Sequence, residues 1–402
     1  MLPSLFPTAT CLLLFLILAS STSAINEDSS RHSHDSLKYN DDVSPQIIAG
    51  YLPDYRSNMD IDSASLYLSH LILFSIAPKA DGTFYGTCCL DSSHFEKARN
   101  AREFKNKILR EMSSDEIKIK KYHPEALRLV ITIGGAGRSD HFSVVTSSRT
   151  SRNRFIKQLI KLVKRHDLDG IDYDWEVPTS QIEVRNYHNL IRETYEELRQ
   201  FNQQQESDRK ISISMTVHPN HIMAPEYYQY VDYIHMMTYD MMPSNMPFHH
   251  ARFDMVTEWA QRFMGEKGRC PSRKIILGIP AYGRHKINHN EVKTYSEIID
   301  QYIDSTTSNN EGQTTLRDID NIDSYADFSF DSPNNVRRKM SWSIENDLGG
   351  VFFWEIGQDK HIASNDSPST KGWIDSVLLK AAASAYVDKS IIASRDILSD
   401  EL

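Results

Sequence analysis

One acidic stretch constrains the fold of this chain more than any other part of the sequence. Residues 168–176 read Leu-Asp-Gly-Ile-Asp-Tyr-Asp-Trp-Glu, which places four carboxylates within eight residues. In a β-strand, Asp172, Asp174 and Glu176 would share one face, about 6.6 Å apart from one to the next. Because a buried row of like charges is costly, the stretch predicts a strand that serves acid–base chemistry. A solvated polar strand or a calcium site is the alternative.

Seven other short apolar runs have the character of β-strands. They cover residues 46–51, 70–77, 128–134, 211–217, 231–238, 274–280 and 349–354. Between the runs, apolar residues recur at helical spacing, as in Phe155, Leu159 and Val163. Alternating strands and helices predict right-handed crossovers and a parallel sheet. Eight such units predict an α/β fold of the (β/α)8 barrel type, and a flat doubly wound sheet is the alternative, although no Gly-rich dinucleotide turn opens the first unit.

In such a barrel, functional side chains lie at the C-terminal ends of the strands. Polar and aromatic residues, together with a pair of glycines, fall at the expected ends: Tyr51, Gly134, Gly135, Glu176, Tyr239, Asp240, Tyr282 and Trp354. This coincidence predicts an active site at that face of the barrel.

The chain also carries segments outside the predicted barrel. Residues 10–19 are an apolar run of signal-peptide length, and the small residue Ala24 offers a cleavage site. An uncleaved anchor is the alternative for this segment. The Ser-, Asp- and His-rich residues that follow have little to bury, which predicts disorder. The expected organisation is a signal peptide over residues 1–24, a disordered leader over 25–44, the barrel over 45–386, with a closing helix at 371–386, and a tail over 387–402.

Composition narrows the classes of partner and cofactor. The net charge is −9, and no Lys/Arg stripe with interleaved aromatic residues is present, which argues against nucleic acid. After residue 24 no apolar run approaches the length of a membrane span, so we expect no membrane segment after signal cleavage. No metal-ligand spacing appears, and we expect neither a metal nor a cofactor.

Beyond the signal peptide, three cysteines remain: Cys88, Cys89 and Cys270. One of the first two could bridge to Cys270, which leaves a thiol free or paired to another chain.

Further motifs accompany the acidic stretch in chain order: Ile131–Gly135, Met237–Asp240, Leu277–Arg284 and Gly349–Glu355. Together with Asp169–Glu176, they resemble the signatures of glycoside hydrolase family 18, the chitinases and chitinase-like lectins, over roughly residues 46–380. The resemblance implies hydrolysis of β-1,4-linked N-acetylglucosamine with retention of configuration. In this family the substrate assists, since its own acetamido oxygen attacks the anomeric carbon.

The resemblance also implies roles for individual residues. Glu176 is expected to be the general acid/base, with a pKa raised by burial and by neighbouring carboxylates. Asp174 would hydrogen-bond the acetamido N–H, and Asp172, deeper in the barrel, would share a proton with Asp174. Tyr239 would donate its O–H to the acetamide oxygen.

Substrate binding is expected at the strand ends. The candidate residues are Tyr51, Phe74, Gly135, Trp175, Met237, Asp240, Tyr282, Arg284 and Trp354. Among these, Trp354 would form the floor under the sugar ring, and plain barrel core is the alternative for Phe74, Met237 and Trp354. Asp169 has the opposite strand parity from Asp172, so it is expected to brace its strand or a neighbour. We expect His218 and His235 to be structural histidines.

Two departures from the family pattern bear on specificity. Thr132 replaces the usual Ser, and Ala136 stands where an aromatic residue often follows the two glycines, which removes one stacking platform on the leaving-group side. The insertion before the eighth strand, within residues 285–340, is expected to be small. The resulting shallow cleft would suit short or branched chains.

The last four residues, Ser399, Asp400, Glu401 and Leu402, resemble a Lys-Asp-Glu-Leu retention signal. With a signal peptide they predict the ER lumen and a retention receptor as a partner; secretion is the alternative. Asn365 begins the sole glycosylation sequon.

From the family resemblance we expect a chitinase-type glycoside hydrolase that acts on chitin or chito-oligosaccharides. The alternatives are an endo-β-N-acetylglucosaminidase that acts on N-glycan cores in the ER, and a lectin without turnover, although the lectins usually lack the acid at the position of Glu176.

Overall fold

The computed structural model describes residues 46–56, 59–84, 90–203, 210–241, 248–308, 319–363 and 374–400. Several sequence-based predictions fall elsewhere. The signal peptide, the leader, Cys88, Cys89, the sequon at Asn365, Glu401 and Leu402 all lie outside the described residues.

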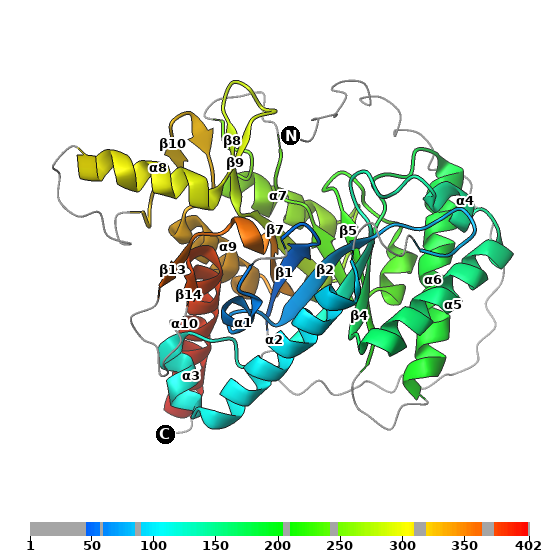
Figure 1. The fold of residues 1–402 in the computed structure, drawn as a ribbon, viewed down its shortest axis with the longest axis horizontal. Coiled ribbons are helices and arrows are strands. Elements are labelled where there is room, and N and C mark those ends of the chain that lie inside the picture. The colour runs from blue at the N-terminus through cyan, green and yellow to red at the C-terminus, as the bar shows by residue number, and fades with distance from the viewer. Residues whose placement is uncertain are drawn as a thin grey trace. The chain divides into compact units, whose positions relative to one another are not determined.

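Eight parallel strands form a closed barrel, which confirms the predicted (β/α)8 fold (Figure 1). The strands are β1 (Ile47–Pro53), β2 (His70–Ile76), β3 (Arg128–Gly134), β4 (Gly170–Asp174), β5 (Ser212–Val217), β6 (Tyr233–Met236), β7 (Ile275–Pro280) and β12 (Gly350–Trp354). Each strand pairs with its neighbour in sequence, and the ring closes where Ile47 on β1 pairs with Gly350 on β12. The flat doubly wound alternative is therefore wrong.

Helices surround the barrel and cover the outer face of its strands (Figure 1). They are α1 (Ile61–Ser65), α2 (Ser92–Glu111), α3 (Ser114–Lys120), α4 (Phe142–Thr146), α5 (Arg149–His166), α6 (Gln181–Gln203), α7 (Phe253–Met264), α9 (Pro333–Glu345) and α10 (Val377–Asp400), with short 3-10 turns at Pro225–Tyr230, Ser272–Lys274 and Ile356–Gln358. A further helix, α8 (Tyr295–Ser308), lies beside the small sheet described below. Local sequence sets their starts. Ser148 caps α5 by accepting a hydrogen bond from Ser151 N, and Ser332 followed by Pro333 opens α9.

The alternation of side chains along the strands creates two apolar layers. On β4, Ile171 and Tyr173 belong to the large outer layer between strands and helices. A smaller inner layer fills the barrel itself: Ile47, Ala49, Tyr51, Ile72, Phe74, Val130, Tyr239, Ala251, Ile276, Tyr282 and Phe352. Because strand residues alternate between faces, Asp172 and Asp174 point toward this inner layer.

The predicted small insertion before the last barrel strand is present. It contains α8 and a four-stranded sheet of β10 (Ser324–Tyr325), β11 (Phe328–Ser329), β8 (Tyr282–His285) and β9 (Val292–Thr294), in that order. Since β8 begins just after β7 ends, this sheet rises directly from the C-terminal end of the seventh barrel strand (Figure 1).

The C-terminal segment differs from the prediction. After β13 (His361–Ala363) and β14 (Ile374–Ser376), α10 runs to Asp400, so the segment predicted as a tail from residue 387 continues the closing helix. Residues 377–400 contain neither Pro nor Gly, and nothing in the sequence ends the helix at 386. Within the described ranges, no helix is both long and apolar enough to cross a membrane.

Candidate active site

The three carboxylates of the acidic stretch meet at the mouth of the barrel. Asp172 and Asp174 lie on β4 and are buried, and Glu176 follows two residues later with partial exposure. The intervening Tyr173 points the other way, where its hydroxyl lies 2.8 Å from Thr194 on α6. The strand therefore presents its acids to the lumen and its aromatic residues to the helices.

Asp172 lies deepest and is surrounded by donors from several strands. Thr132 Oγ1 on β3 donates to Asp172 Oδ2 at 2.9 Å, Ser214 Oγ on β5 to Oδ1 at 2.7 Å, and Tyr51 Oη on β1 to Oδ2 at 3.0 Å. Burial raises the pKa of Asp172, but hydrogen bonds from His235, Ser214 and Thr132 and the charge of His235 outweigh it, so that this pKa lies below its ordinary value. Asp172 is therefore an ionised carboxylate.

Asp174 pairs with Glu176. Burial raises the pKa of Asp174, and the charges of Glu176 and Asp172 and a hydrogen bond with Glu176 raise it further. Burial also raises the pKa of Glu176, against hydrogen bonds from the Ala136 backbone and from Asp174 that lower it. The pKa values of Asp174 and Glu176 are thus both raised, whereas that of Asp172 is lowered, and proton sharing between Asp172 and Asp174 stays a prediction. The donors around Asp172, which lie far apart in sequence, make the difference.

Two glycines let the third strand approach this pair. Gly135 N donates to Asp174 O at 2.6 Å, and Ser139 Oγ accepts from Glu176 N at 3.1 Å. Gly135 has φ +92°, and a Cβ atom there would lie 2.2 Å from the ring of Phe74. The double glycine therefore permits close contact among β2, β3 and β4 just beneath Glu176.

Aromatic rings line the mouth beside the carboxylates. The ring of Trp354, half-buried at the end of β12, meets Phe74 edge-on at 4.6 Å and Tyr51 at 5.6 Å. Tyr239 follows β6 and meets Tyr282 at 6.3 Å. Burial raises the pKa of Tyr239 well above its ordinary value, with further contributions from nearby carboxylates, so its hydroxyl stays protonated and can donate a hydrogen bond. Met237 packs against the same inner layer.

Asp240 and Arg284 form an ion pair at the rim. Arg284 Nε lies 2.8 Å from Asp240 Oδ1, and its Nη2 lies 2.5 Å from Oδ2. Burial raises the pKa of Asp240, but His250 and Arg284 outweigh that effect and hold it well below its ordinary value. The pair presents a fixed, charged hydrogen-bonding edge next to Tyr239.

Trp175 and Asp169, two further residues of the acidic stretch, also point away from the lumen. Trp175 was predicted to bind substrate, and this is wrong: its ring stacks on Phe142 at 5.2 Å and meets Tyr187 at 5.3 Å, on the helix side of the barrel. The strand parity that aligns the acids excludes it. Asp169 accepts a hydrogen bond from Leu129 N at 2.7 Å, which joins the start of β4 to β3.

Sequence reasoning missed several polar residues that hold the site. Ser214 and Thr216 contact Asp172 from β5, and His235 Nδ1 lies 2.7 Å from Tyr51 Oη and 3.4 Å from Asp172. The alternating hydroxyls of Ser212, Ser214 and Thr216 were a usable signal, since a period of two places them on one face. His235 is structural, as predicted, and it supports the carboxylate row through its contacts with Tyr51 and Asp172. No group of His, Cys, Asp and Glu within the described ranges could hold a metal ion.

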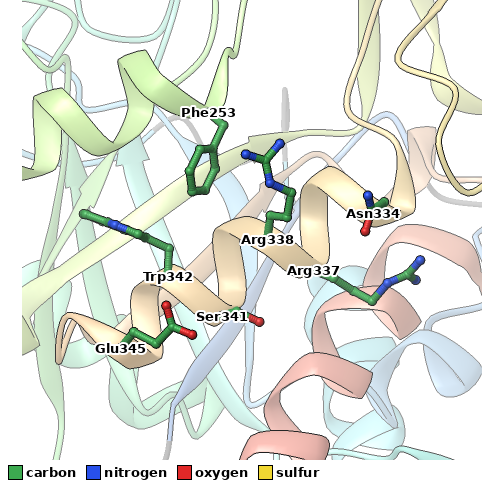
Figure 2. A pocket seen from close by; sticks show the side chains of 7 residues that line it. All are labelled: Phe253, Asn334, Arg337, Arg338, Ser341, Trp342 and Glu345. Carbon is green, nitrogen blue, oxygen red and sulfur yellow. The ribbon is translucent and has the colours of Figure 1, made fainter.

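Two other features lie apart from the carboxylate row. Cys270 is buried, with Sγ 3.6 Å from Pro271 O. An open groove of about 380 Å³ lies along α9 beside the start of α7, where the Arg338 guanidinium stacks 4.3 Å above Phe253 (Figure 2). Its lining residues are Phe253, Asn334, Arg337, Arg338, Ser341, Trp342 and Glu345, none of which is a predicted site residue.

The fold and the site define a class of protein: a (β/α)8 barrel that carries a row of acids on its fourth strand, beside an aromatic floor. The family model of glycosyl hydrolases family 18 matches residues 51–359, and the chain belongs to that family.

Curated relatives share part of their length with this chain. Endochitinase 1 of Metarhizium robertsii is 26% identical over 270 residues, which cover 58% of this chain and 62% of the relative. Sporulation-specific chitinase 2 of Saccharomyces cerevisiae is 25% identical over 274 residues, which cover 57% of this chain and 54% of the relative. The matches thus span less than two thirds of these relatives.

Solved structures share the fold over nearly their whole length. A GH18 chitinase of Flavobacterium johnsoniae superposes with a TM-score of 0.64 at 19% identity, covering 86% of this chain and 95% of that protein. A class V chitinase mutant of Cycas revoluta, in complex with (GlcNAc)3, gives a TM-score of 0.63 at 20% identity, covering 85% and 99%.

Proposed function

We propose that this protein hydrolyses β-1,4 bonds between N-acetylglucosamine residues, with retention of configuration and with Glu176 as the general acid/base. The observation that carries the proposal is the row of acids at the mouth of the barrel, with Asp172 and Asp174 buried on β4 and Glu176 partly exposed two residues later. An ionised Asp172 lies beneath an Asp174–Glu176 pair whose pKa values are both raised. A carboxyl group that keeps its proton near neutral pH is what a general acid requires.

The first step is transfer of the Glu176 proton to the glycosidic oxygen. The bond from that oxygen to the anomeric carbon breaks, and the leaving chain departs as an alcohol. The acetamido oxygen of the sugar forms a new bond to the anomeric carbon, which gives a cyclic oxazolinium ion. Asp174 accepts a hydrogen bond from the nitrogen of this ion, and Tyr239 donates to the acetamide oxygen before it attacks.

The second step restores the enzyme. Glu176, now a carboxylate, takes a proton from a water molecule, whose oxygen attacks the anomeric carbon. The bond to the acetamido oxygen breaks, and the two displacements together retain the configuration. Trp354 forms the floor under the sugar ring, and the Asp240–Arg284 pair contacts its polar edge.

Chito-oligosaccharides are the favoured substrates. The curated relatives are chitinases by name, and the Cycas revoluta protein binds (GlcNAc)3. The chitobiose core of N-glycans offers the same bond. The signal peptide and the final residues Ser399, Asp400, Glu401 and Leu402 support this second substrate, because they favour the ER lumen, where such glycans are abundant.

The test compares wild type with Glu176→Gln on labelled chitotetraose and on an N-glycopeptide. We expect wild type to cleave the tetrasaccharide with retained configuration, and Glu176→Gln to bind it without turnover. Cleavage of the glycopeptide alone would move the activity to glycan processing. Binding of both substrates without cleavage by wild type would make the protein a lectin. A substrate deacetylated at the scissile sugar should be inert, and rapid cleavage of it would exclude substrate assistance.

The location of the protein has its own test. We propose that the chain enters the secretory pathway through residues 1–24 and is returned to the ER by a retention receptor that binds its last four residues. Deletion of these four residues should move the protein from cells into the medium. Equal secretion of both forms would contradict retention.

A further inference from the structure

A buried histidine contacts the rim ion pair from below. The side chain of His250 is fully buried, and its Nδ1 lies 3.1 Å from Asp240 Oδ1 and 3.3 Å from the backbone nitrogen of the same residue. Its other nitrogen, Nε2, has no hydrogen-bond partner within the described part of the chain. The side-chain hydrogen bonds that the structure gives His250 are therefore directed at Asp240.

His250 and Arg284 contact the Asp240 carboxylate from different sides of the chain fold. The guanidinium reaches both carboxylate oxygens of Asp240 from β8, whereas His250 reaches one oxygen and the backbone from the segment before α7. Asp240 has φ +56°, a left-handed conformation that residues other than glycine adopt uncommonly, although Asp tolerates it better than most. Two elements from different parts of the chain thus hold this unusual residue in place.

The segment that carries His250 is itself fixed from the outer side of the barrel. His249 Nε2 lies 2.8 Å from Phe330 O, and Lys339 Nζ on α9 donates to Ala251 O at 2.8 Å. Lys339 also forms a fully buried ion pair with Asp331 at 2.5 Å. Because these bonds lie on either side of His250 in sequence, the imidazole has little freedom to move.

The imidazole ring of His250 also packs against Tyr282, next to the ion pair. His250 meets Tyr282 at 5.1 Å, with the ring planes tilted by 39°, and the Arg284 guanidinium lies 5.9 Å from the centre of the same Tyr282 ring. The imidazole therefore fixes Asp240 within a cluster that also includes two predicted sugar-binding residues.

We propose that His250 is a positioning residue for substrate binding: it holds the Asp240 carboxylate in the orientation in which Asp240 and Arg284 contact the sugar. The inference rests on the proposed function, because it assumes that this pair faces the sugar. His250 does not itself touch the substrate and transfers no proton.

The test is a double-mutant cycle between His250 and Asp240. His250→Phe keeps a ring against Tyr282 and removes the contact of Nδ1 with Asp240, and His250→Asn restores a short polar group near the position of Nδ1. We expect His250→Phe to raise KM for chitotetraose about tenfold, as the loss of a hydrogen bond to a charged group would. We expect kcat to change less, and His250→Asn to recover part of the loss. In an Asp240→Ala background, His250→Phe should have little further effect.

A matched control separates positioning from general destabilisation. His188 on α6 is also buried and stacks on Tyr227 at 3.9 Å, away from the carboxylate row. His188→Phe should change the melting temperature without raising KM. Additive effects of His250→Phe and Asp240→Ala, or a loss of stability in His250→Phe with KM unchanged, would overturn the proposal.

A failure of the proposed hydrolysis can be distinguished from a failure of the positioning role of His250. If wild type does not cleave chitotetraose, calorimetric binding of the same oligosaccharide to Glu176→Gln, with and without His250→Phe, tests the positioning role alone. Weaker binding in the double variant supports the role of His250 even though hydrolysis is rejected. Unchanged binding, or no binding in either protein, overturns it.

Discussion

Tyr51 on the first barrel strand donates a hydrogen bond to Asp172 on the fourth, with Oη 3.0 Å from Oδ2. The same hydroxyl lies 2.7 Å from both Thr216 Oγ1 and His235 Nδ1. One phenol thus joins β1, β4, β5 and β6 beneath Asp174 and Glu176. It adds a donor to the lowest carboxylate of the row, and the charge of that carboxylate raises the pKa of Asp174 above it.

Tyr51→Phe should therefore lower both stability and activity. The change removes a donor from a buried carboxylate, which costs about 1–3 kcal/mol in the free energy of unfolding. It also raises the pKa of Asp172 and so weakens the field that favours a protonated Asp174–Glu176 pair. Urea unfolding and kcat on chitotetraose measure the two effects.

Tyr67→Phe is the matched control for this change. Tyr67 is equally buried, and its hydroxyl donates to Asp375 Oδ1 at 2.6 Å, outside the barrel lumen. Its loss should destabilise the protein and leave kcat unchanged. An unchanged kcat in Tyr51→Phe as well would separate Asp172 from catalysis.

Gly135→Ala should disrupt the mouth of the barrel. The new methyl group would collide with Phe74, and the left-handed backbone adds about 1–2 kcal/mol of strain. Gly137 is a control for backbone strain alone. It also has a left-handed backbone, with φ +72°, but no atom lies within 4 Å of the position that a methyl group would take there. Gly137→Ala should therefore lose stability without a large loss of kcat/KM, whereas Gly135→Ala should lose both. Similar kinetics for the two variants would show that the Phe74 contact is dispensable.

Glu176→Gln should be more stable than wild type above neutral pH. A carboxyl group whose pKa is raised in the folded state binds its proton more tightly there than in the unfolded chain. Its contribution to stability is present at low pH and is lost as the pH rises through the raised pKa. The neutral amide avoids that loss. Melting temperatures at pH 4 and pH 8 should diverge between the two proteins only at pH 8, and a constant difference would contradict the raised pKa.

Asp359 should give the C-terminal helix a similar pH dependence. Its carboxylate accepts hydrogen bonds from Leu378 N and Leu379 N at the start of α10, and burial raises its pKa from 3.8 to about 7. Stability from this group should thus fall as the pH rises from about 4 to about 7. Asp359→Asn keeps an acceptor oxygen without the charge. The difference in unfolding midpoint between the two proteins should shrink toward low pH, and a difference independent of pH would show that Asp359 is ionised throughout.

The sequence predicted the barrel well, because strand and helix periodicity are local properties. All eight apolar runs became barrel strands, and the parity argument placed Asp172, Asp174 and Glu176 on one face. The same parity excludes Trp175, which the motif alone favours as a site residue. The boundary error at residue 387 arose because no residue marks the end of α10.

The supporting contacts could not be predicted in the same way. His235 and Tyr51 are separated by 184 positions, and their bond depends on how the barrel closes. His250 follows residues 242–247, which lie outside the described part of the chain, and no periodicity points its ring at Asp240. The pKa shifts of the three carboxylates depend on such contacts, which a motif alone does not contain.

The closure of the barrel between β1 and β12 also bears on how the chain is made. β1 pairs with β2, which follows it closely in sequence, but its other edge pairs with Gly350–Trp354, about 300 residues later. Until then a buried-type, apolar strand presents unpaired backbone groups, which is the kind of edge that aggregates or engages chaperones. The second edge of the first strand is therefore covered only after the segment that contains the last barrel strand has been made.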